Sequence, residues 1–287
     1  YEFLREMEFN RLLSQAISFY GDTDDKASSR EIKPKKISKI DTKSYKSILN
    51  EKELNELIKN LNEKSIIAVD TETSSINPQE AKLIGISISY ATNIAFYIPL
   101  GHKNTKGLKK DLVLDKLKKI LEDPSIQKVC QNTKYDFIIF KNYGIELSSV
   151  EDTMLLSYTL DAGNNRHNMD TLSELHLGHK TISYKDLVGT GKKQLNFVDV
   201  DIKSATEYAA EDADITLRLY EVLSERVSEE KLERVYEEFE KPMIKILSRL
   251  EMNGIKVDDA YLKKLSKKFE ERLITIEKEI YKISGKK

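Results

Sequence analysis

The stretch Ile66-Ile67-Ala68-Val69-Asp70-Thr71-Glu72-Thr73 decides the fold of this chain. Its apolar half, residues 66–69, is bounded by charge, which is typical of a buried strand in a mixed or parallel sheet. Asp70 and Glu72 are two residues apart, and side chains on extended backbone alternate between faces, so both carboxylates leave the strand on the same side. Two like charges held so close raise each other's pKa, so the pair needs a cation at neutral pH. Acids that merely solvate a turn are the alternative for this stretch alone.

The composition is that of a soluble globular chain with a heavily charged surface. The 287 residues are 39% hydrophobic and 33% charged, enough for one large domain with appendages or for two small ones. No apolar run approaches the ~20 residues of a membrane helix, and we expect no secretory leader. The single cysteine, Cys130, excludes a disulfide framework and fits a reducing compartment. Because the chain begins at Tyr1 rather than Met, we expect it to be an internal piece of a longer protein.

Apolar spacing and then a polar, lysine-rich composition predict an N-terminal helix and a linker over residues 1–45. Apolar residues from Phe9 to Tyr20 have the spacing of an amphipathic helix, and Gly21 ends the pattern. The segment 22–44 is polar and lysine-rich, which favours a solvated tether over a dedicated DNA-binding arm. The formal net charge of the chain is −1, so any nucleic-acid binding must come from a local arrangement.

Residues 46–225 are expected to form an α/β domain. The pattern predicts a helix over 49–61 before the 66–73 strand, strands at 83–90 and 94–98 joined as a hairpin, a helix over 113–121, a short strand at 128–130 and a helix that begins near Lys134. The order β-β-β-α-β-α, with its hairpin, fits a mixed sheet better than a doubly wound one.

Helical patterning dominates the rest of the chain, and residues 226–287 are expected to be a helical segment. Apolar residues from Val227 to Leu250 predict a long helix that Asn253-Gly254 ends with a left-handed cap. Asp258 is the predicted N-cap of a last helix, which carries an exposed apolar stripe.

Two further acids lie on predicted helices. Asn132 and Asp136 are four residues apart after the 128–130 strand, and Tyr208 and Asp212 are four apart in a strongly helical segment. Each pair alone has a simpler interpretation, with Asn132 as a helix cap, Asp136 as a first-turn acid and Tyr208 as a half-buried aromatic.

The neighbouring charged residues are expected to be structural. Glu211 and Asp214 point away from Asp212 on the helix, which favours a solvated surface or, for Asp214, an ion pair with Arg218. Three histidines show no ligand spacing and are expected to be structural or exposed: His102, His176 and His179.

Taken together, the acids suit metal-dependent phosphoryl transfer. Hard divalent cations bind oxygen ligands, and a few carboxylates leave coordination positions open for water and phosphate. Two such ions ~3.5–4 Å apart can stabilise both the attacking and the leaving oxygen of an in-line displacement.

Three pairs of residues resemble the three exonuclease motifs of the DEDDy branch of the DnaQ-like 3′–5′ exonucleases: Asp70/Glu72, Asn132/Asp136 and Tyr208/Asp212. The stretches around them, with 167–172, are similar to the proofreading domain of family A, bacterial-type DNA polymerase I. Residues 239–255 are similar to the start of that family's thumb, so the resemblance covers roughly Lys46 to the C-terminus.

The resemblance implies a ribonuclease H-like mixed sheet flanked by helices, and two-metal-ion hydrolysis of 3′-terminal nucleotides from single-stranded or frayed DNA. It implies that Asp70, Glu72 and Asp212 hold the tighter of two divalent cations, Mg²⁺ with Mn²⁺ or Zn²⁺ as alternatives. Asp136, with Asp70, would position the second cation through water, and Tyr208 would orient the attacking water.

The resemblance also implies five DNA contacts. Gln131 and Asn132 would reach the terminal nucleotide, and Ile76 would wedge against its base. Arg166 would contact a phosphate, and Tyr184 would stack on a single-stranded base.

The implied partners are a DNA 3′ end and the polymerase domain of the same parent chain. The family implies a monomer, no membrane, and a location in the cytoplasm (the bacterial nucleoid) or an organelle matrix. The chain lacks the polymerase motifs, so we do not expect it to synthesise DNA unaided. Two alternatives stay open: a ribonuclease D-like RNA 3′ exonuclease, which the thumb-like C-terminus disfavours, and a catalytically silent domain that binds single strands, which the complete set of acids disfavours.

Overall fold

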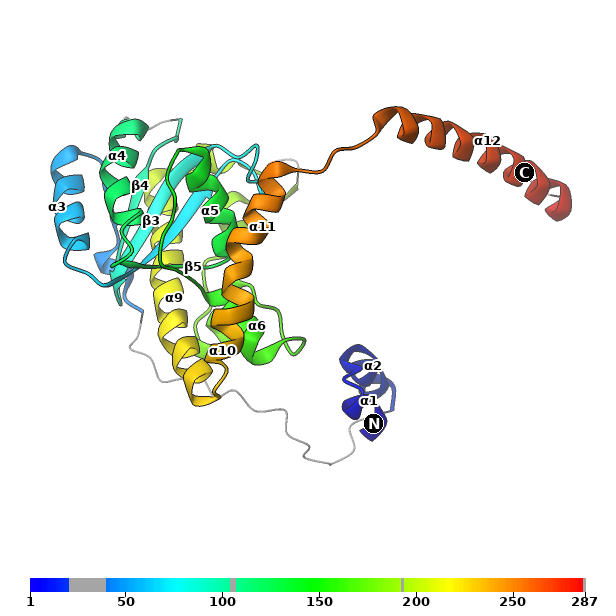
Figure 1. The fold of residues 1–287 in the computed structure, drawn as a ribbon, viewed down its shortest axis with the longest axis horizontal. Coiled ribbons are helices and arrows are strands. Elements are labelled where there is room, and N and C mark those ends of the chain that lie inside the picture. Colours follow the sequence, from blue (N-terminus) through cyan, green and yellow to red (C-terminus); the bar gives the residue numbers. More distant parts are fainter. Residues whose placement is uncertain (21–39, 104–106, 192–193, 286–287) are drawn as a thin grey trace. The chain divides into compact units, whose positions relative to one another are not determined.

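A computed structural model describes residues 1–20, 40–103, 107–191 and 194–285 (Figure 1). Most of the predicted basic linker lies outside these ranges. The chain divides into two compact units, Tyr1–Arg249 and Leu250–Lys287. No helix in the described ranges combines the length and the apolar character needed to cross a membrane. The domain boundaries expected at residues 45 and 225 stay predictions.

A six-stranded mixed sheet forms the centre of the first unit, with the strand order β1-β4-β3-β2-β5-β6. The strands are β1 (Lys46–Ser47), β2 (Ile66–Thr73), β3 (Leu83–Ala91), β4 (Ile94–Pro99), β5 (Gln127–Cys130) and β6 (Val150–Asp152). The pairs β2·β3 and β3·β4 are antiparallel, whereas β1·β4, β2·β5 and β5·β6 are parallel. The mixed sheet is confirmed. The edge strands β1 and β6 were not predicted, because two or three residues are too few to show a period.

One face of the sheet is apolar and packs against three helices, α3 (Glu51–Leu61), α4 (Lys110–Leu121) and α5 (Thr133–Asn142). Strand β2 contributes the side chains of Ile67 and Val69 to this face, and both are fully buried. The side chains that build this core share alternate positions on the strands and apolar stripes on the helices: Leu54, Leu57, Ile86, Ile88, Ile98, Leu117, Ile139 and Phe140.

The long helix α9 (Ile202–Glu229) packs against β2, β3 and β4 (Figure 1). Residues opposite each other in antiparallel strands share a face, and Asp70 is opposite Ser87 while Glu72 is opposite Gly85. Gly85 has no space for a side chain, because a Cβ there would lie 2.1 Å from the hydroxyl of Tyr97. Small residues therefore flank the acids, where α9 approaches the sheet.

Short helices connect β6 to α9. They are α6 (Thr153–Asp161), α7 (Met169–Leu172), the π-helical turn η2 (Ser173–Leu177), α8 (Tyr184–Val188) and the 3₁₀ turn η4 (Phe197–Asp199). At the N-terminus, α1 (Glu2–Glu6) precedes α2 (Asn10–Tyr20), and the 3₁₀ turn η1 (Thr42–Ser44) leads into β1. The helix predicted from Phe9 to Tyr20 is confirmed by α2.

The long helix predicted from Val227 to Leu250 is wrong, because the chain turns between two helices there. After α9 ends, Lys231 has φ +59°, a left-handed conformation that a helix cannot continue through. The chain then forms α10 (Glu233–Val235), the π-helical turn η5 (Tyr236–Glu240) and α11 (Lys241–Asn253).

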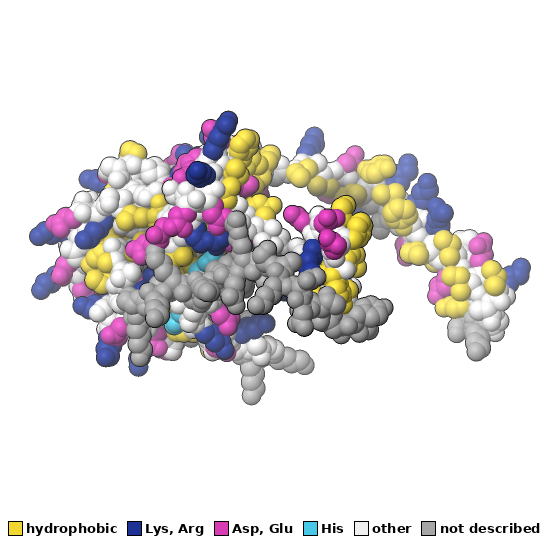
Figure 2. Space-filling view, turned by 90° about the horizontal axis from the view of Figure 1, so that it is seen from below, with side chains coloured by type: hydrophobic (Ala, Val, Ile, Leu, Met, Phe, Trp, Pro, Cys, Tyr) yellow, Lys and Arg dark blue, Asp and Glu magenta, His cyan; other side chains and the backbone are white. Residues whose placement is uncertain are grey.

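Two predicted caps are confirmed, the left-handed cap that ends α11 and the N-cap of the last helix, α12 (Asp259–Ser284). Gly254 has φ +67°, the left-handed conformation expected after α11, and the Asp258 side chain accepts a hydrogen bond from the Tyr261 N–H. The apolar stripe is also confirmed, since Phe269 and Leu273 are exposed, and Figure 2 shows hydrophobic side chains along this helix.

Candidate active site

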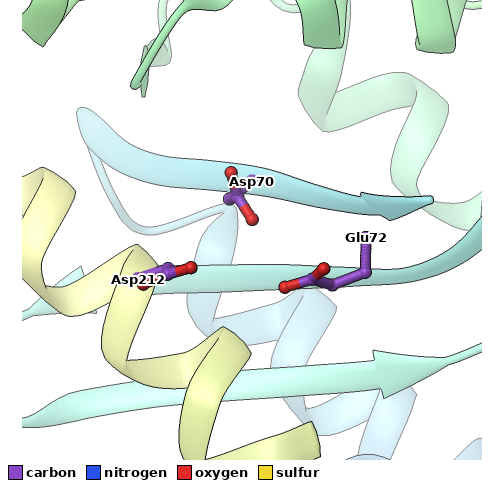
Figure 3. Close-up of side chains that lie close together, drawn as sticks. All are labelled: Asp70, Glu72 and Asp212. Atoms are coloured by element: carbon purple, nitrogen blue, oxygen red, sulfur yellow. The ribbon is translucent and has the colours of Figure 1, made fainter. Parts of the chain in front are cut away.

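Three carboxylates lie together where α9 packs against β2. Asp70 and Glu72 come from β2, and Asp212 comes from α9 (Figure 3). One oxygen from each of the three lies within 4.8 Å of the others. The prediction that Asp70 and Glu72 leave the strand on one side is therefore confirmed. The fold brings Asp212 to them, although it is 140 residues away from Glu72 in the sequence.

Burial and mutual repulsion leave these acids in need of positive charge. Burial raises the pKa of Asp70 to about 6. Burial, followed by the carboxylates of Asp70, Asp212 and Asp136, raises the pKa of Glu72 well above its usual range. Glu72 Oε1 is buried and has no hydrogen-bond partner in the described part of the chain. An unsatisfied buried carboxylate among oxygen donors fits a hard divalent cation.

Asp136, from the first turn of α5, lies beside this group of three but is not part of it. It is almost fully buried, and its Oδ1 accepts a 2.5 Å hydrogen bond from the hydroxyl of Thr71, which stands between Asp70 and Glu72 on β2. Burial, followed by the charge of Asp70, raises the pKa of Asp136 well above its usual range. A role for Asp136 toward a second cation stays a prediction.

Asn132 begins α5 in a left-handed conformation, φ +66°, which Asn tolerates better than most residues. Asn132 occupies the N-cap position of α5, but its side chain makes no capping hydrogen bond. Asp152 at the end of β6 supplies the acceptors instead. Its Oδ1 accepts from the Asn132 N–H at 3.2 Å, and its Oδ2 accepts from the Thr133 N–H at 2.8 Å.

Tyr208 lies one turn before Asp212 on α9, within an aromatic cluster that also contains Tyr184 and Phe197. Burial, then the charges of Asp212, Glu72 and Asp70, raises the pKa of the Tyr208 hydroxyl. The phenol therefore stays neutral and can donate a hydrogen bond at neutral pH. Tyr184 stacks on Phe197 at 6.5 Å between ring centroids and is 43% exposed.

The remaining predicted DNA contacts differ in their surroundings. Ile76, in the turn after β2, is 97% exposed. Arg166 is exposed in the loop that precedes α7. Gln131 already has protein partners, because its Nε2 donates to the His167 carbonyl at 2.8 Å and its Oε1 accepts from Thr153. These contacts stay predictions.

The expectation of a solvated surface for Glu211 and Asp214 is wrong. Asp214 is fully buried and accepts hydrogen bonds from Tyr45, the Asn93 N–H and Arg218, so the predicted ion pair with Arg218 is confirmed at 3.1 Å. Helix α9 is buried on nearly all sides over 209–219, which sequence periodicity alone could not show.

Glu211 ties the segment before α8 to the same helix. Its Oε1 lies 2.9 Å from His179 Nε2, and its Oε2 accepts from the Ile182 N–H at 2.7 Å. His102 and His176 are buried, and His102 shares a 2.7 Å hydrogen bond with Tyr97, so their structural role is confirmed.

Three supporting residues carried no sequence signal: Thr71, Tyr97 and Asp152. Thr71 and Asp152 act through partners distant in sequence, so spacing does not reveal them. Tyr97 lies on the face of the sheet that carries the acids, which only the strand register shows. Tyr97 on β4 is fully buried, and its pKa is raised by burial and then by the charges of Glu72 and Asp70.

Comparison with known proteins identifies this arrangement. A family model described as a 3′–5′ exonuclease matches residues 45–228. The chain belongs to this exonuclease family. DNA polymerase I of Rhizobium leguminosarum is 42% identical over 271 residues, which cover 86% of this chain and 26% of that protein. The chain spans about a quarter of the length of the curated relatives it matches.

Solved structures show the same fold for this exonuclease domain. The POL domain of Pol1 from M. smegmatis, in complex with DNA primer-template and dNTP, superposes with a TM-score of 0.66 at 19% identity, covering 84% of this chain and 38% of that one. RNase D of Escherichia coli superposes with a TM-score of 0.58 at 20% identity, covering 72% of this chain and 51% of that one. The ribonuclease H-like fold class is thus confirmed.

Proposed function

We propose that this 3′–5′ exonuclease domain proofreads for a family A DNA polymerase, hydrolysing the 3′-terminal nucleotide of single-stranded or frayed DNA. The observation that carries the proposal is the meeting of Asp70, Glu72 and Asp212 within 4.8 Å, with Glu72 and Asp212 buried. The identity to DNA polymerase I over most of the chain supports DNA as the substrate.

The carboxylates would hold two divalent cations, Mg²⁺ or Mn²⁺. Asp70, Glu72 and Asp212 form the first set of ligands, and Asp136 with Asp70 serves the second. Bound cations lower the pKa of coordinated water and neutralise charge on the phosphate. Glu72 Oε1, which has no partner in the described chain, is the oxygen best placed to accept a cation.

Tyr208 and the exposed side chains would handle the nucleic acid and the water. The neutral Tyr208 hydroxyl, next to Asp212, orients the attacking water by hydrogen bonding. Ile76 and Tyr184 offer exposed apolar and aromatic surfaces to the terminal bases, and stacking on an aromatic side chain contributes about 1–3 kcal/mol per base. Asn132, whose side chain does not cap α5, offers a polar group to the terminal nucleotide.

The polymerase domain of the same parent protein would be the covalent partner, and the domain would act as a monomer in the cytoplasm. The chain spans only about a quarter of its polymerase I relatives, which supports a parent chain with further domains.

The test is incubation of the protein with 5′-labelled DNA and RNA oligonucleotides of one sequence, in Mg²⁺ and in EDTA. We expect a ladder that shortens from the 3′ end of the DNA only in Mg²⁺. Faster shortening of the RNA would favour the ribonuclease D-like alternative. An intact but bound oligonucleotide would mean a silent strand-binding domain.

A further inference from the structure

A buried polar network is centred on Glu151, the middle residue of β6. Glu151 is 4% exposed, and its two oxygens accept three hydrogen bonds. The Oε1 atom accepts from Gln127 Nε2 at 2.7 Å and from Lys241 Nζ at 2.6 Å, and Oε2 accepts from the Tyr236 hydroxyl at 2.8 Å. The carboxylate is therefore fully paired by groups from β5 and from the helical segment after α9.

The π-helical turn η5 brings Tyr236 and Lys241 to this carboxylate together. Residues five apart share a face in a π-helical turn, and Lys241 Nζ lies 5.7 Å from the centre of the Tyr236 ring. Such turns widen a helix at a cost and occur often at functional sites. Here the turn places two donors on Glu151, the middle residue of the short edge strand β6.

The Tyr236 hydroxyl also reaches the residue that organises α5. It accepts a 3.0 Å hydrogen bond from the Asp152 N–H while it donates to Glu151. Asp152 in turn accepts from the N–H groups of Asn132 and Thr133, which open the helix that carries Asp136. One hydroxyl thus fixes the backbone of β6, and β6 fixes the first turn of α5.

We propose that Tyr236 is a positioning residue of the exonuclease site, acting through Asp152 on the placement of Asp136. The proposal rests on the proposed function in so far as Asp136 serves a divalent cation. Tyr236 lies outside the residues 45–228 that the family model matches, so the site depends on the helical segment that follows. A misplaced carboxylate weakens cation binding even when the fold is intact, as loss of an outer-shell partner does.

The test compares Tyr236→Phe with a matched variant, Tyr220→Phe. Both changes remove one phenol hydroxyl from the same network, the buried hydroxyl of Tyr236 or that of the half-buried Tyr220, which donates to Gln127 Oε1 at 3.3 Å. Of these two tyrosines, only Tyr236 bonds to Asp152 among the described residues. The rate constant kcat and the KM for a single-stranded DNA oligonucleotide are measured for both, with Mn²⁺ affinity by electron paramagnetic resonance and the melting temperature of each protein.

For Y236F we expect kcat to fall about 10-fold, with Mn²⁺ affinity weakened by a similar factor and KM for DNA unchanged. For Y220F we expect kcat and Mn²⁺ affinity within about twofold of wild type, at a comparable loss of melting temperature. Equal Mn²⁺ affinity in Y236F and wild type would overturn the proposal, as would equal defects in both variants. A wild-type protein that binds Mn²⁺ but degrades no DNA would instead count against the proposed function.

Discussion

The hydroxyl of Thr71 donates a 2.5 Å hydrogen bond to the carboxylate of Asp136, which joins the strand of candidate metal ligands to helix α5. Both partners are buried, so water cannot replace the bond if it is lost. The relationship shows how the acids of β2 and α5 are held in one arrangement.

Replacing Thr71 by valine should therefore lower exonuclease activity about 10-fold with little change in DNA binding, because Asp136 loses its fixed orientation. Steady-state kinetics on a single-stranded DNA oligonucleotide measures this. Thr159→Val is the matched control, since the Thr159 hydroxyl donates to the Leu155 carbonyl on α6 and, among the described residues, to no acid of the site. Similar losses in the two variants would argue against a role for the Thr71 contact.

Changing Asp70 or Asp212 to alanine should abolish metal-dependent cleavage and leave the protein folded. Each substitution removes a carboxylate that repels its neighbours, so the melting temperature without metal should stay the same or rise. Thermal unfolding followed by circular dichroism, together with the cleavage assay, gives both readouts. Activity retained in both variants would eliminate the proposed site.

Stability without metal should decrease as pH rises. The folded-state pKa of Asp70 is raised from 3.8 to about 6, so the native state binds more protons than the unfolded chain between these values. Stability then falls as pH increases through this window and levels off above it. Melting temperatures from pH 4 to pH 8 in EDTA should show the decline, and Asp70→Asn should reduce it. A flat profile for the wild-type protein would contradict the raised pKa.

Replacing Tyr208 by phenylalanine should lower kcat by about 100-fold, because the attacking water loses the hydrogen bond that orients it toward the phosphate. Mn²⁺ affinity should be unchanged, since the phenol is not a ligand in this account. Comparing cleavage rates with Mn²⁺ titrations separates the two effects. If Mn²⁺ binding weakens as much as the rate falls, Tyr208 acts on the cations rather than on the water.

Gly85 lies opposite Glu72, and substituting it by alanine should destabilise the protein by about 1–3 kcal/mol, because the added methyl group meets the Tyr97 ring. Chemical denaturation measures the change. Ser87→Ala, on the same face of β3, should be neutral or stabilising, because the buried Ser87 hydroxyl has no hydrogen-bond partner among the described residues. Equal stability of the Gly85 variant and wild type would mean that the sheet adapts to the methyl group.

The central strand and its acids could be predicted because their signal is local. The apolar run before Asp70 sets the strand, and alternation sets the side of both carboxylates. The pairing of Asp212 with them came from the resemblance to a family, since no local pattern joins β2 to a helix 140 residues later. The buried state of Asp214 and the roles of Thr71 and Asp152 depend on partners that only the folded chain brings close.

The most direct test of the central claim is the digestion of a 5′-labelled primer with a 3′ mismatch, annealed to its template, in Mg²⁺. The account predicts stepwise shortening from the mismatched 3′ end, release of deoxynucleoside monophosphates, and no shortening in EDTA or with the Asp70→Ala and Asp212→Ala proteins. Shortening that persists in EDTA, or in both variants, would contradict it.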